Sequence, residues 1–405
     1  MRLPLSSRPI DFPTMTSTPS DQPNRRDFRI IDLFAGPGGL DVAAEVLGIP
    51  SIGIEWDDDA VATRLAAGLP TVHGDVRLFG PGNPEFEDCN VLAGGPPCQT
   101  FSIAGSGSGR KALDLVTGFI HRMHAWYKRE KAGKTGETWE DIQRELDKLE
   151  DERTGLVLQP LRWIFEAMLR PRHGGEDPQP FEVVVLEQVP AVIEVWHEYE
   201  KVLGAVGYKT KAKVFHTEQY GVPQTRRRAV LVARYGDAPA RLPEPTNQQY
   251  RKGTAPADTL FGGRGAWISM EEAFNAVYER VDEAPRRVMP FCVVSNYGSG
   301  GDPKARGRRA SNEPAATITG KWKRNRIVSA DAQEADLGRL SNQEAGVLQS
   351  FPYRYPWRGN EQAQQIGNAV PPQFGVHVLS AALGLGAPGS DVWERLLRWS
   401  REGAS

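Results

Sequence analysis

The chain has 405 residues, and its 49 Lys and Arg stand against 51 Asp and Glu, so the formal net charge is −2. This length is enough for two domains with hydrophobic cores of their own. Hydrophobic content of 40% and charged content of 25% are ordinary for a soluble globular protein. No apolar run reaches the roughly 18 residues of a membrane span. We therefore expect a cytoplasmic protein that does not bind a membrane.

Residues 1–27 are rich in Pro, Ser, Thr and Arg and lack an apolar stretch, which predicts a disordered leader rather than a signal peptide. The three cysteines, Cys89, Cys98 and Cys292, form no CxxC pair, so we expect no metal site of the common zinc type. Their sparse, odd count fits a reducing cytosol. Cys89 and Cys292 lie beside apolar strand-like runs and are assigned to the core.

Charge is unevenly distributed along the chain. Residues 205–330 hold 22 Lys and Arg against 11 Asp and Glu, whereas the remainder holds 27 against 40. This asymmetry indicates a polyanionic partner for the basic part. A solvated basic face remains the alternative at this point.

In chain order, apolar strands are predicted at residues 29–35, 51–56, 89–95 and 181–190. Helical patterns follow the first two, and strands alternating with helices favour a doubly wound, Rossmann-like α/β sheet. The runs 208–221 and 226–236 have the pattern of a β-hairpin, which gives a mixed sheet with an antiparallel edge. Between these strands, a charged segment at about 110–150 is predicted to form a helical hairpin. An apolar helix near the C-terminus is predicted to pack back onto the first domain.

The first strand opens into a Gly-rich turn, "DLFAGPGGLD", with glycines at positions 36, 38 and 39. Glycines allow a tight turn and close approach of a ligand to the backbone. The carboxyl end of a strand that leads into a helix is the usual ligand crevice of such folds. Pro37 removes one N–H from this turn, and no P-loop Lys follows, so a phosphate cradle is disfavoured.

Acidic and aromatic residues end the next strands. Glu55 stands at the end of the second strand, where an acid accepts hydrogen bonds from ribose hydroxyls. Trp56 offers a flat face for an adenine, with ordinary core packing as the alternative. Asp75, near the end of a further short strand, is placed to read an exocyclic amine. An adenosine without phosphates fits this set, and S-adenosylmethionine is such a molecule.

"GGPPCQTFS" holds a single thiol behind two prolines. Pro96 and Pro97 lack N–H donors and exclude a helix, so they stiffen the approach to Cys98. Because the segment follows a strand end, Cys98 is expected at the rim of the crevice. Backbone N–H groups and positive surroundings there favour the reactive thiolate. A turn with an incidental cysteine is the alternative.

Five blocks in this order, "DLFAGPGGLD", "GGPPCQTFS", "EQVP", "QTRRR" and "GNAVPP", resemble those of the DNA (cytosine-5)-methyltransferases over most of residues 28–385. The resemblance implies an S-adenosylmethionine-dependent methyltransferase fold that flips a cytosine out of duplex DNA. A thiolate adds to C6 of the base, which makes C5 nucleophilic toward the methyl group. Loss of the C5 proton and of the thiolate then restores the ring.

Residue roles follow from the matching positions. Glu187 is expected to hydrogen-bond cytosine N3 and its amine, with a pKa raised by burial. Gln188 departs from the family, which usually has Asn there. Arg228 is expected near the target base and Arg226 on a phosphate, and a solvated basic edge strand is the alternative. The catalytic set is Cys98, Glu187, Arg228, Gln99 and Pro97.

The resemblance also implies two binding sets. The cofactor set is Phe34, Ala35, Gly36, Gly38, Gly39, Leu40, Glu55, Trp56, Asp75, Val76, Pro97, Leu156, Asn368 and Val370. The DNA-binding set is Ser102, Gln224, Arg226, Arg228, Arg309, Thr317 and Lys323.

The implied organisation is a catalytic, cofactor-binding domain at 28–235, a small target-recognition domain at 236–330, and a segment at 331–405 that returns to the first domain. Residues 229–313 are short for recognition, so the helical insert is a candidate for DNA contacts or a partner surface, with a solvated decoration as the alternative. We expect a monomer that acts on double-stranded DNA, with any cognate restriction endonuclease or other defence-system subunit on a separate chain.

Two other functions stay open at this level. One is the RNA-methylating branch of the same family, which acts on tRNA. Gln99 after Cys98 argues against it, because that branch has Phe-Thr after the nucleophile. The other is a non-catalytic, methyltransferase-like regulator that binds DNA. Such a regulator has no need of the thiol or of Glu187.

Overall fold

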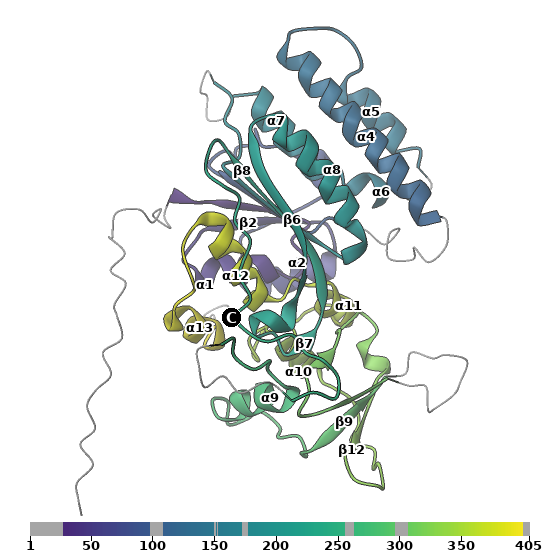
Figure 1. The fold of residues 1–405 in the computed structure, drawn as a ribbon, viewed down its shortest axis with the longest axis vertical. Helices are drawn as coiled ribbons and strands as arrows, with labels where there is room; N and C mark the ends of the chain where they lie inside the picture. The colour runs from purple at the N-terminus through teal and green to yellow at the C-terminus, as the bar shows by residue number, and fades with distance from the viewer. Residues whose placement is uncertain are drawn as a thin grey trace, which may run out of the picture.

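The computed structural model describes residues 27–97, 108–149, 151, 153–171, 177–255, 263–295 and 307–399. A seven-stranded sheet in the order β3-β2-β1-β4-β5-β8-β6 forms its centre (Figure 1). Neighbouring strands from β3 to β5 pair in parallel, whereas β8 is antiparallel to both β5 and β6. The strand bounds are β1 Ile30–Leu33, β2 Ser51–Glu55, β3 Thr71–His73, β4 Val91–Gly94, β5 Val183–Gln188, β6 Tyr208–His216 and β8 Arg227–Tyr235. The predicted mixed, doubly wound sheet with an antiparallel edge is confirmed.

Helices cover both faces of this sheet (Figure 1). On one side lie α1 Gly39–Val46, α2 Asp58–Ala66, α12 Pro372–Leu383 and α13 Ser390–Leu397. On the other lie α4 Ser108–Lys131, α5 Trp139–Leu146, α6 Arg153–Leu156, α7 Gln159–Leu169 and α8 Ile193–Gly204. The first four residues of β5 are apolar for this reason: Val183 and Val185 pack into one cluster, and Val184 and Leu186 into the other. The C-terminal helix α12 returns to α1, as predicted.

The lower part of Figure 1 holds a small sheet of three antiparallel strands, β10-β9-β12. The strands are β9 Phe291–Val294, β10 Arg308–Ala310 and β12 Arg326–Ser329, and the helix α9 Met270–Tyr278 precedes them in the chain. A short parallel pair, β7 Gln224–Thr225 with β11 Ala315–Ala316, joins it to the main sheet. The connection back is made by α10 Asn342–Leu348 and α11 Gln362–Asn368. Phe291 and Ile327 share one hydrophobic cluster with α1 and α12, so this part shares a core with one face of the large sheet.

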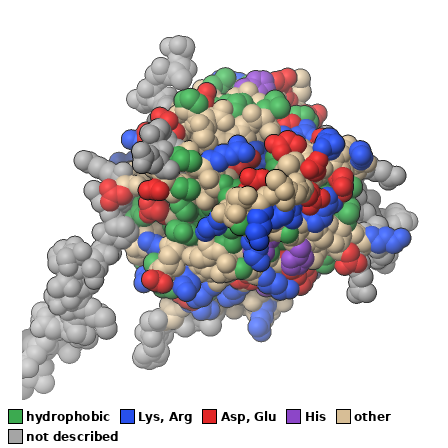
Figure 2. All heavy atoms as spheres, turned by 90° about the horizontal axis from the view of Figure 1, so that it is seen from above, with side chains coloured by type: hydrophobic (Ala, Val, Ile, Leu, Met, Phe, Trp, Pro, Cys, Tyr) green, Lys and Arg blue, Asp and Glu red, His purple; other side chains and the backbone are tan. Residues whose placement is uncertain are grey.

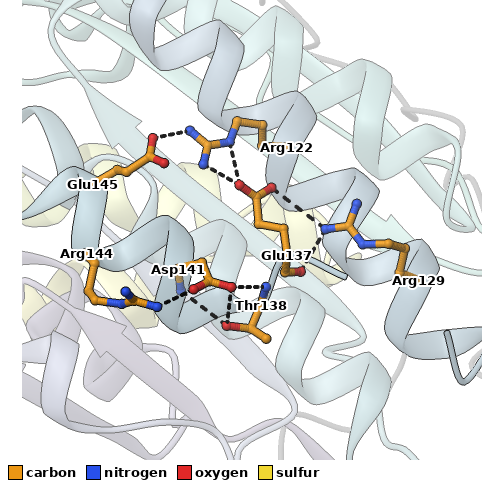
Figure 3. Close-up of polar contacts among 7 residues, drawn as sticks. All are labelled: Arg122, Arg129, Glu137, Thr138, Asp141, Arg144 and Glu145. Carbon is orange, nitrogen blue, oxygen red and sulfur yellow. Dashed lines mark hydrogen bonds and ion pairs between the residues drawn. The ribbon is translucent and has the colours of Figure 1, made fainter. Parts of the chain in front are cut away.

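The segment at about 110–150 forms the predicted helical hairpin, α4 and α5 (Figure 3). Arg122 on α4 donates to Glu137 in the connection, at 3.1 Å from Nε to Oε1, and to Glu145 on α5, at 2.6 Å from Nη1 to Oε2. Thr138 caps α5 by a reciprocal pair of hydrogen bonds with Asp141. These contacts hold the two helices against each other.

The hairpin is not a detached decoration, because the inner face of α4 is part of the core. Val116, Ile120 and Met123 are fully buried in the cluster that also contains α7 and α8. Across the part of the chain that the structure describes, α4 included, no helix is long and apolar enough to cross a membrane.

Candidate active site

The turn after β1 uses its glycines in two different ways. Gly36 and Gly38 have φ of 55° and 100°, in the left-handed region that favours glycine. A Cβ added at Gly36 would have no neighbour within 4 Å. One at Gly38 would lie 2.2 Å from Leu69, and one at Gly39 would lie 2.0 Å from the Val370 carbonyl oxygen. Gly36 is therefore open to a ligand, whereas Gly38 and Gly39 serve close packing.

Glu55, the last residue of β2, gathers three backbone N–H groups. Its Oε2 accepts from Gly36 at 2.7 Å, and its Oε1 accepts from Trp56 at 2.8 Å and Asp57 at 2.9 Å. Burial raises the pKa of Glu55, and the three N–H groups oppose that shift. Trp56 beside it is 64% exposed, so its indole is not core. The open Gly36, the carboxylate and the exposed ring fit an adenosine-type cofactor.

Asp75 lies two residues after β3 and begins a short 3₁₀ turn, Val76–Leu78. Its carboxylate accepts from the Arg77 N–H at 2.8 Å and from Arg77 Nη2 at 2.6 Å. Burial would raise the pKa of Asp75, but the Arg77 contacts lower it overall. Val76 is buried. Of the remaining predicted neighbours of the turn, Ala35 and Leu40 are buried, and Phe34 is half-buried with a φ of 60°.

Three predicted cofactor residues come from distant parts of the chain. The Val370 carbonyl lies against Gly39, which brings the C-terminal segment to the turn. Asn368 is exposed at the end of α11. Leu156 ends α6, where a Cβ added at the preceding Gly155 would lie 3.4 Å from Leu146 of α5. Nothing in these contacts joins Leu156 to the Gly-rich turn.

Two supports of the turn were missed from the sequence. Asp41 forms a fully buried ion pair with Arg64, 2.6 Å from Oδ2 to Nη1. Asp32 lies beside this pair, and its pKa is raised, chiefly by burial and then by Asp41. The Tyr355 hydroxyl donates to the Pro37 carbonyl. Tyr355 stands in the C-terminal segment, 331–405, and only the folded chain brings it to the turn.

The nucleophile segment leaves the sheet between β1 and β5. After β4, Gly95 donates its N–H to the Leu33 carbonyl at 3.2 Å. A Cβ at Gly94 would lie 2.9 Å from that same oxygen, so the close passage requires glycine. Pro96 and Pro97 follow. The predicted residues Cys98, Gln99 and Ser102 lie outside the described residues.

In space, Glu187 lies beside Gly95, where this segment begins. A Cβ at Gly95 would be 3.8 Å from Glu187 Oε2, and Glu187 is 6% exposed. Arg228 Nε lies 2.8 Å from Glu187 Oε1, both held by the antiparallel pairing of β5 with β8. Burial raises the pKa of Glu187, and Arg228 and Arg226 act in the opposite direction. The predicted acid and the predicted Arg228 are therefore together, in a setting that favours the protonated carboxyl.

The residue after Glu187 contacts the nucleophile segment directly. Gln188 Nε2 donates to the Pro96 carbonyl at 2.6 Å, and its Oε1 accepts from the Val189 N–H. The sequence flagged Gln188 only as a departure from the family, and its contact was not foreseen.

Gln224 and Arg226 hold the chain together rather than face solvent. Both are fully buried. Arg226 donates to the carbonyls of Ile318 at 3.0 Å, Gly367 at 3.0 Å and Ala369 at 3.1 Å. The strand is interrupted at Arg226, between β7 and β8, so Arg226 does not project beside Arg228 as expected. Neither Gln224 nor Arg226 has the exposed surface that a DNA contact needs, which corrects that expectation.

The other predicted DNA-binding residues lie in the small sheet and its connections. Arg309 stacks on the Tyr250 ring at 4.5 Å. Thr317 is exposed, and its hydroxyl donates to the Thr225 carbonyl at 2.7 Å. Lys323 is exposed, with Nζ 5.6 Å from the centre of the Trp322 ring. These side chains keep surface that a DNA backbone can reach.

Comparison with known proteins places these features in a family. The model of the C-5 cytosine-specific DNA methylases matches residues 28–120 and 182–383. The chain is 25% identical over 384 residues to the Type II methyltransferase M1.HphI of Haemophilus parahaemolyticus, covering 87% of this chain and 86% of that one. It is 27% identical over 353 residues to the Type II methyltransferase M.AplI of Arthrospira platensis, covering 85% and 82%.

Solved structures share the fold. The Dnmt2 methyltransferase of S. pombe aligns with a TM-score of 0.52 at 14% identity, over 89% of this chain and 100% of that one. The Entamoeba histolytica methyltransferase EhMeth aligns with a TM-score of 0.53 at 12% identity, over 89% and 99%. Between the two matched segments, residues 121–181 of this chain have no counterpart in the family model, and they include most of the helical hairpin.

Proposed function

This chain belongs to the family of C-5 cytosine-specific DNA methylases, and we propose that it is a DNA (cytosine-5-)-methyltransferase that methylates C5 of a flipped-out cytosine in duplex DNA. The observation that carries the proposal is the buried Glu187, with its raised pKa, at the start of the Pro-Pro-Cys segment. The names of the relatives, Type II methyltransferases, favour a role in a restriction-modification system.

The methyl donor of this reaction is S-adenosylmethionine, which supplies an electrophilic sulfonium methyl group when it is bound. Gly36 leaves room for it at the turn, and Glu55, which accepts three N–H groups, has about one lone pair left for a ribose hydroxyl. Trp56 offers its exposed ring to the adenine, and Asp75 and Asn368 complete the pocket. No cluster of metal-ligating side chains occurs among the described residues, and the proposed chemistry needs none.

Each catalytic residue has a separate task. Cys98 supplies the thiolate that forms a bond to C6 of cytosine. Glu187 in its protonated form donates to N3, which withdraws electrons from the ring and assists that addition. Arg228 holds the Glu187 carboxyl in place from β8. Pro97 and Gln99 flank the nucleophile and orient the base. Methylated C5 then loses its proton, and the C6–S bond breaks to release the thiolate.

The proposed affinity for DNA comes first from contacts of basic and polar side chains with the phosphate backbone, which do not depend on the base sequence. Lys323, Arg309, Thr317 and Ser102 are proposed to contact the DNA. The first three lie in residues 205–330, where Lys and Arg outnumber acids by two to one, 22 to 11. Such phosphate contacts give an affinity that falls with salt and is shared by all sequences. Extruding one cytosine from the stack costs a few kcal/mol, which these contacts offset.

Mapping 5-methylcytosine by bisulfite sequencing, in a plasmid expressed with this gene, tests the function. We expect methylation at one short recurring sequence in DNA and none in host tRNA. Cys98→Ala is expected to abolish methylation, because alanine forms no bond to C6, while S-adenosylmethionine binding stays intact.

Cys292→Ala is the matched control, since Cys292 is a buried core thiol in the small sheet. It is expected to keep methylation. Persistent methylation by Cys98→Ala would contradict the covalent route, and tRNA methylation without DNA methylation would contradict the substrate.

A further inference from the structure

Through its side chain, Gln188 hydrogen-bonds to the first of the two prolines before the nucleophile. It ends β5, directly after Glu187, and is half-buried. Its amide bonds in two directions: Nε2 donates to the Pro96 carbonyl at 2.6 Å, and Oε1 accepts from the Val189 N–H. One side chain thus ties the end of β5 to the segment that leaves β4.

The hydrogen bond from Gln188 uses the only kind of backbone group that the two prolines offer. Pro96 and Pro97 have no N–H, so their backbone offers only carbonyl oxygens to the surrounding protein. The neighbouring anchor is the Gly95 N–H on the Leu33 carbonyl, at 3.2 Å. Gly95 fixes the segment to β1, and Gln188 fixes it to β5. With φ of both prolines set by their rings, these two anchors define the direction in which the chain leaves toward Cys98.

The length of the Gln188 side chain allows it to make both hydrogen bonds, to Pro96 and to Val189. The Oε1 atom is held by the N–H of the next residue, Val189, and Nε2 is thereby turned toward Pro96. Asparagine is shorter by one methylene, about 1.5 Å of reach. An asparagine at this position therefore loses either the hold on Val189 or the full contact with Pro96. The departure from the usual Asn is matched to the geometry of this chain.

We propose that Gln188 is a positioning residue for the reaction, which sets the Pro-Pro arm through its hydrogen bond to the Pro96 carbonyl. The inference rests on the proposed methyl transfer by Cys98. Gln188 acts through Pro96 rather than on the base or the cofactor directly. Its effect is on the orientation of the arm, and small displacements of a reacting group cost about 100-fold in rate.

Gln188→Glu is the decisive variant, because it keeps the shape and replaces only the donor. An ionised carboxylate still accepts from Val189 but presents an oxygen, not an N–H, to the Pro96 carbonyl. We expect kcat to fall by about 10- to 100-fold at mildly alkaline pH. KM for DNA, S-adenosylmethionine affinity and the melting temperature are expected to stay close to those of the wild type.

The kcat of Gln188→Glu is expected to recover at low pH. A protonated carboxyl donates its O–H to the Pro96 carbonyl, so the variant-to-wild-type ratio of kcat is expected to rise as the pH falls. Gln188→Asn keeps a donor, so it is expected to lose less kcat at alkaline pH and to show no recovery in acid. Gln179→Glu, an exposed change ahead of β5, is the charge control and is expected to behave as wild type.

Three results would overturn the proposal: wild-type kcat for Gln188→Glu at every pH, an equal loss at every pH with a lower melting temperature, or acid recovery in Gln188→Asn as well. Wild-type protein that methylates no DNA would instead refute the proposed function. The two failures are therefore distinguishable in one experiment.

Discussion

At the scale of single residues, Glu187 shows how position decides chemistry. It is the next-to-last residue of β5, and the four residues before it in the strand are all buried, so its carboxyl is removed from water. Desolvation raises its pKa, and the nearby Arg228 and Arg226 limit the rise. The result is a carboxyl that keeps its proton more readily than an exposed glutamate. In the proposed reaction, that is the form that donates to cytosine N3.

The pH dependence follows from the sign of this shift. Because the protonated carboxyl is the active form in the proposed reaction, kcat of the wild type is expected to fall as the pH rises through the raised pKa of Glu187. Glu187→Gln removes the titrating group and the transferable proton. We expect its kcat to fall by about 100- to 10,000-fold and this limb of the pH profile to disappear.

Single-turnover methyl transfer across a pH series measures both effects. A Glu187→Gln profile that is parallel to the wild type, at any rate, would show that another group is responsible for the pH dependence.

At the scale of elements, most of the charged contacts of the helical hairpin are made within the hairpin itself. Residues 108–149 contain nine Lys and Arg against seven Asp and Glu. Arg122, Arg129 and Arg144 all contact acceptors within the hairpin (Figure 3). On the face seen from above, basic and acidic side chains are interspersed (Figure 2). Such a surface offers little net attraction to a polyanion, so the structure favours a structural element over DNA contacts.

The double variant Lys128→Glu, Lys134→Glu tests this reading of the hairpin, since both side chains are exposed on it. Its affinity for DNA and the dependence of that affinity on salt are expected to match the wild type, because these lysines neutralise no phosphate. Fluorescence anisotropy with labelled duplex over a salt series measures both. A weaker, less salt-dependent binding would return the hairpin to the DNA interface. Deleting the hairpin is a poorer test, because the inner face of α4 is core.

At the scale of the whole molecule, one buried polar cluster joins the catalytic sheet to the small sheet and the C-terminal segment. Gln224 donates to the Leu348 carbonyl at 2.8 Å and to Gln349, and accepts from the Ile318 N–H at 3.0 Å. Arg226 adds three carbonyls from the same two segments. Every segment in this cluster depends on the others for its buried hydrogen bonds. The "QTRRR" block is therefore partly a joint between the parts of the molecule.

Arg226→Met is expected to lower the free energy of unfolding by about 3 kcal/mol or more, because it leaves three buried carbonyls without donors. Lys323→Gln is the matched comparison. It is expected to leave stability unchanged, weaken DNA binding equally for all sequences, and reduce the salt slope of log K by about 0.9. Denaturant titration and anisotropy separate the two. A stable Arg226→Met protein with a reduced salt slope would return Arg226 to the phosphate backbone.

The sequence by itself determined the order of strands and helices, the mixed sheet with its hairpin edge, and the blocks that identify the chemistry. These are local signals: apolar runs covered on both faces, glycines where φ is positive at positions 36 and 38, and prolines before Cys98. Glu55 at the end of β2 followed from the same logic, since parallel strands end at one edge of the sheet.

Only the tertiary structure decided what the polar residues contact. Arg226 and Arg228 have the same sequence signal, yet one is enclosed by carbonyls of residues 318, 367 and 369, and the other pairs with Glu187. Gln188 is one departure from a block until Pro96, 92 positions away, is brought to it. Such partners are distant in the chain, and burial sets which donors have acceptors, so no local pattern contains them.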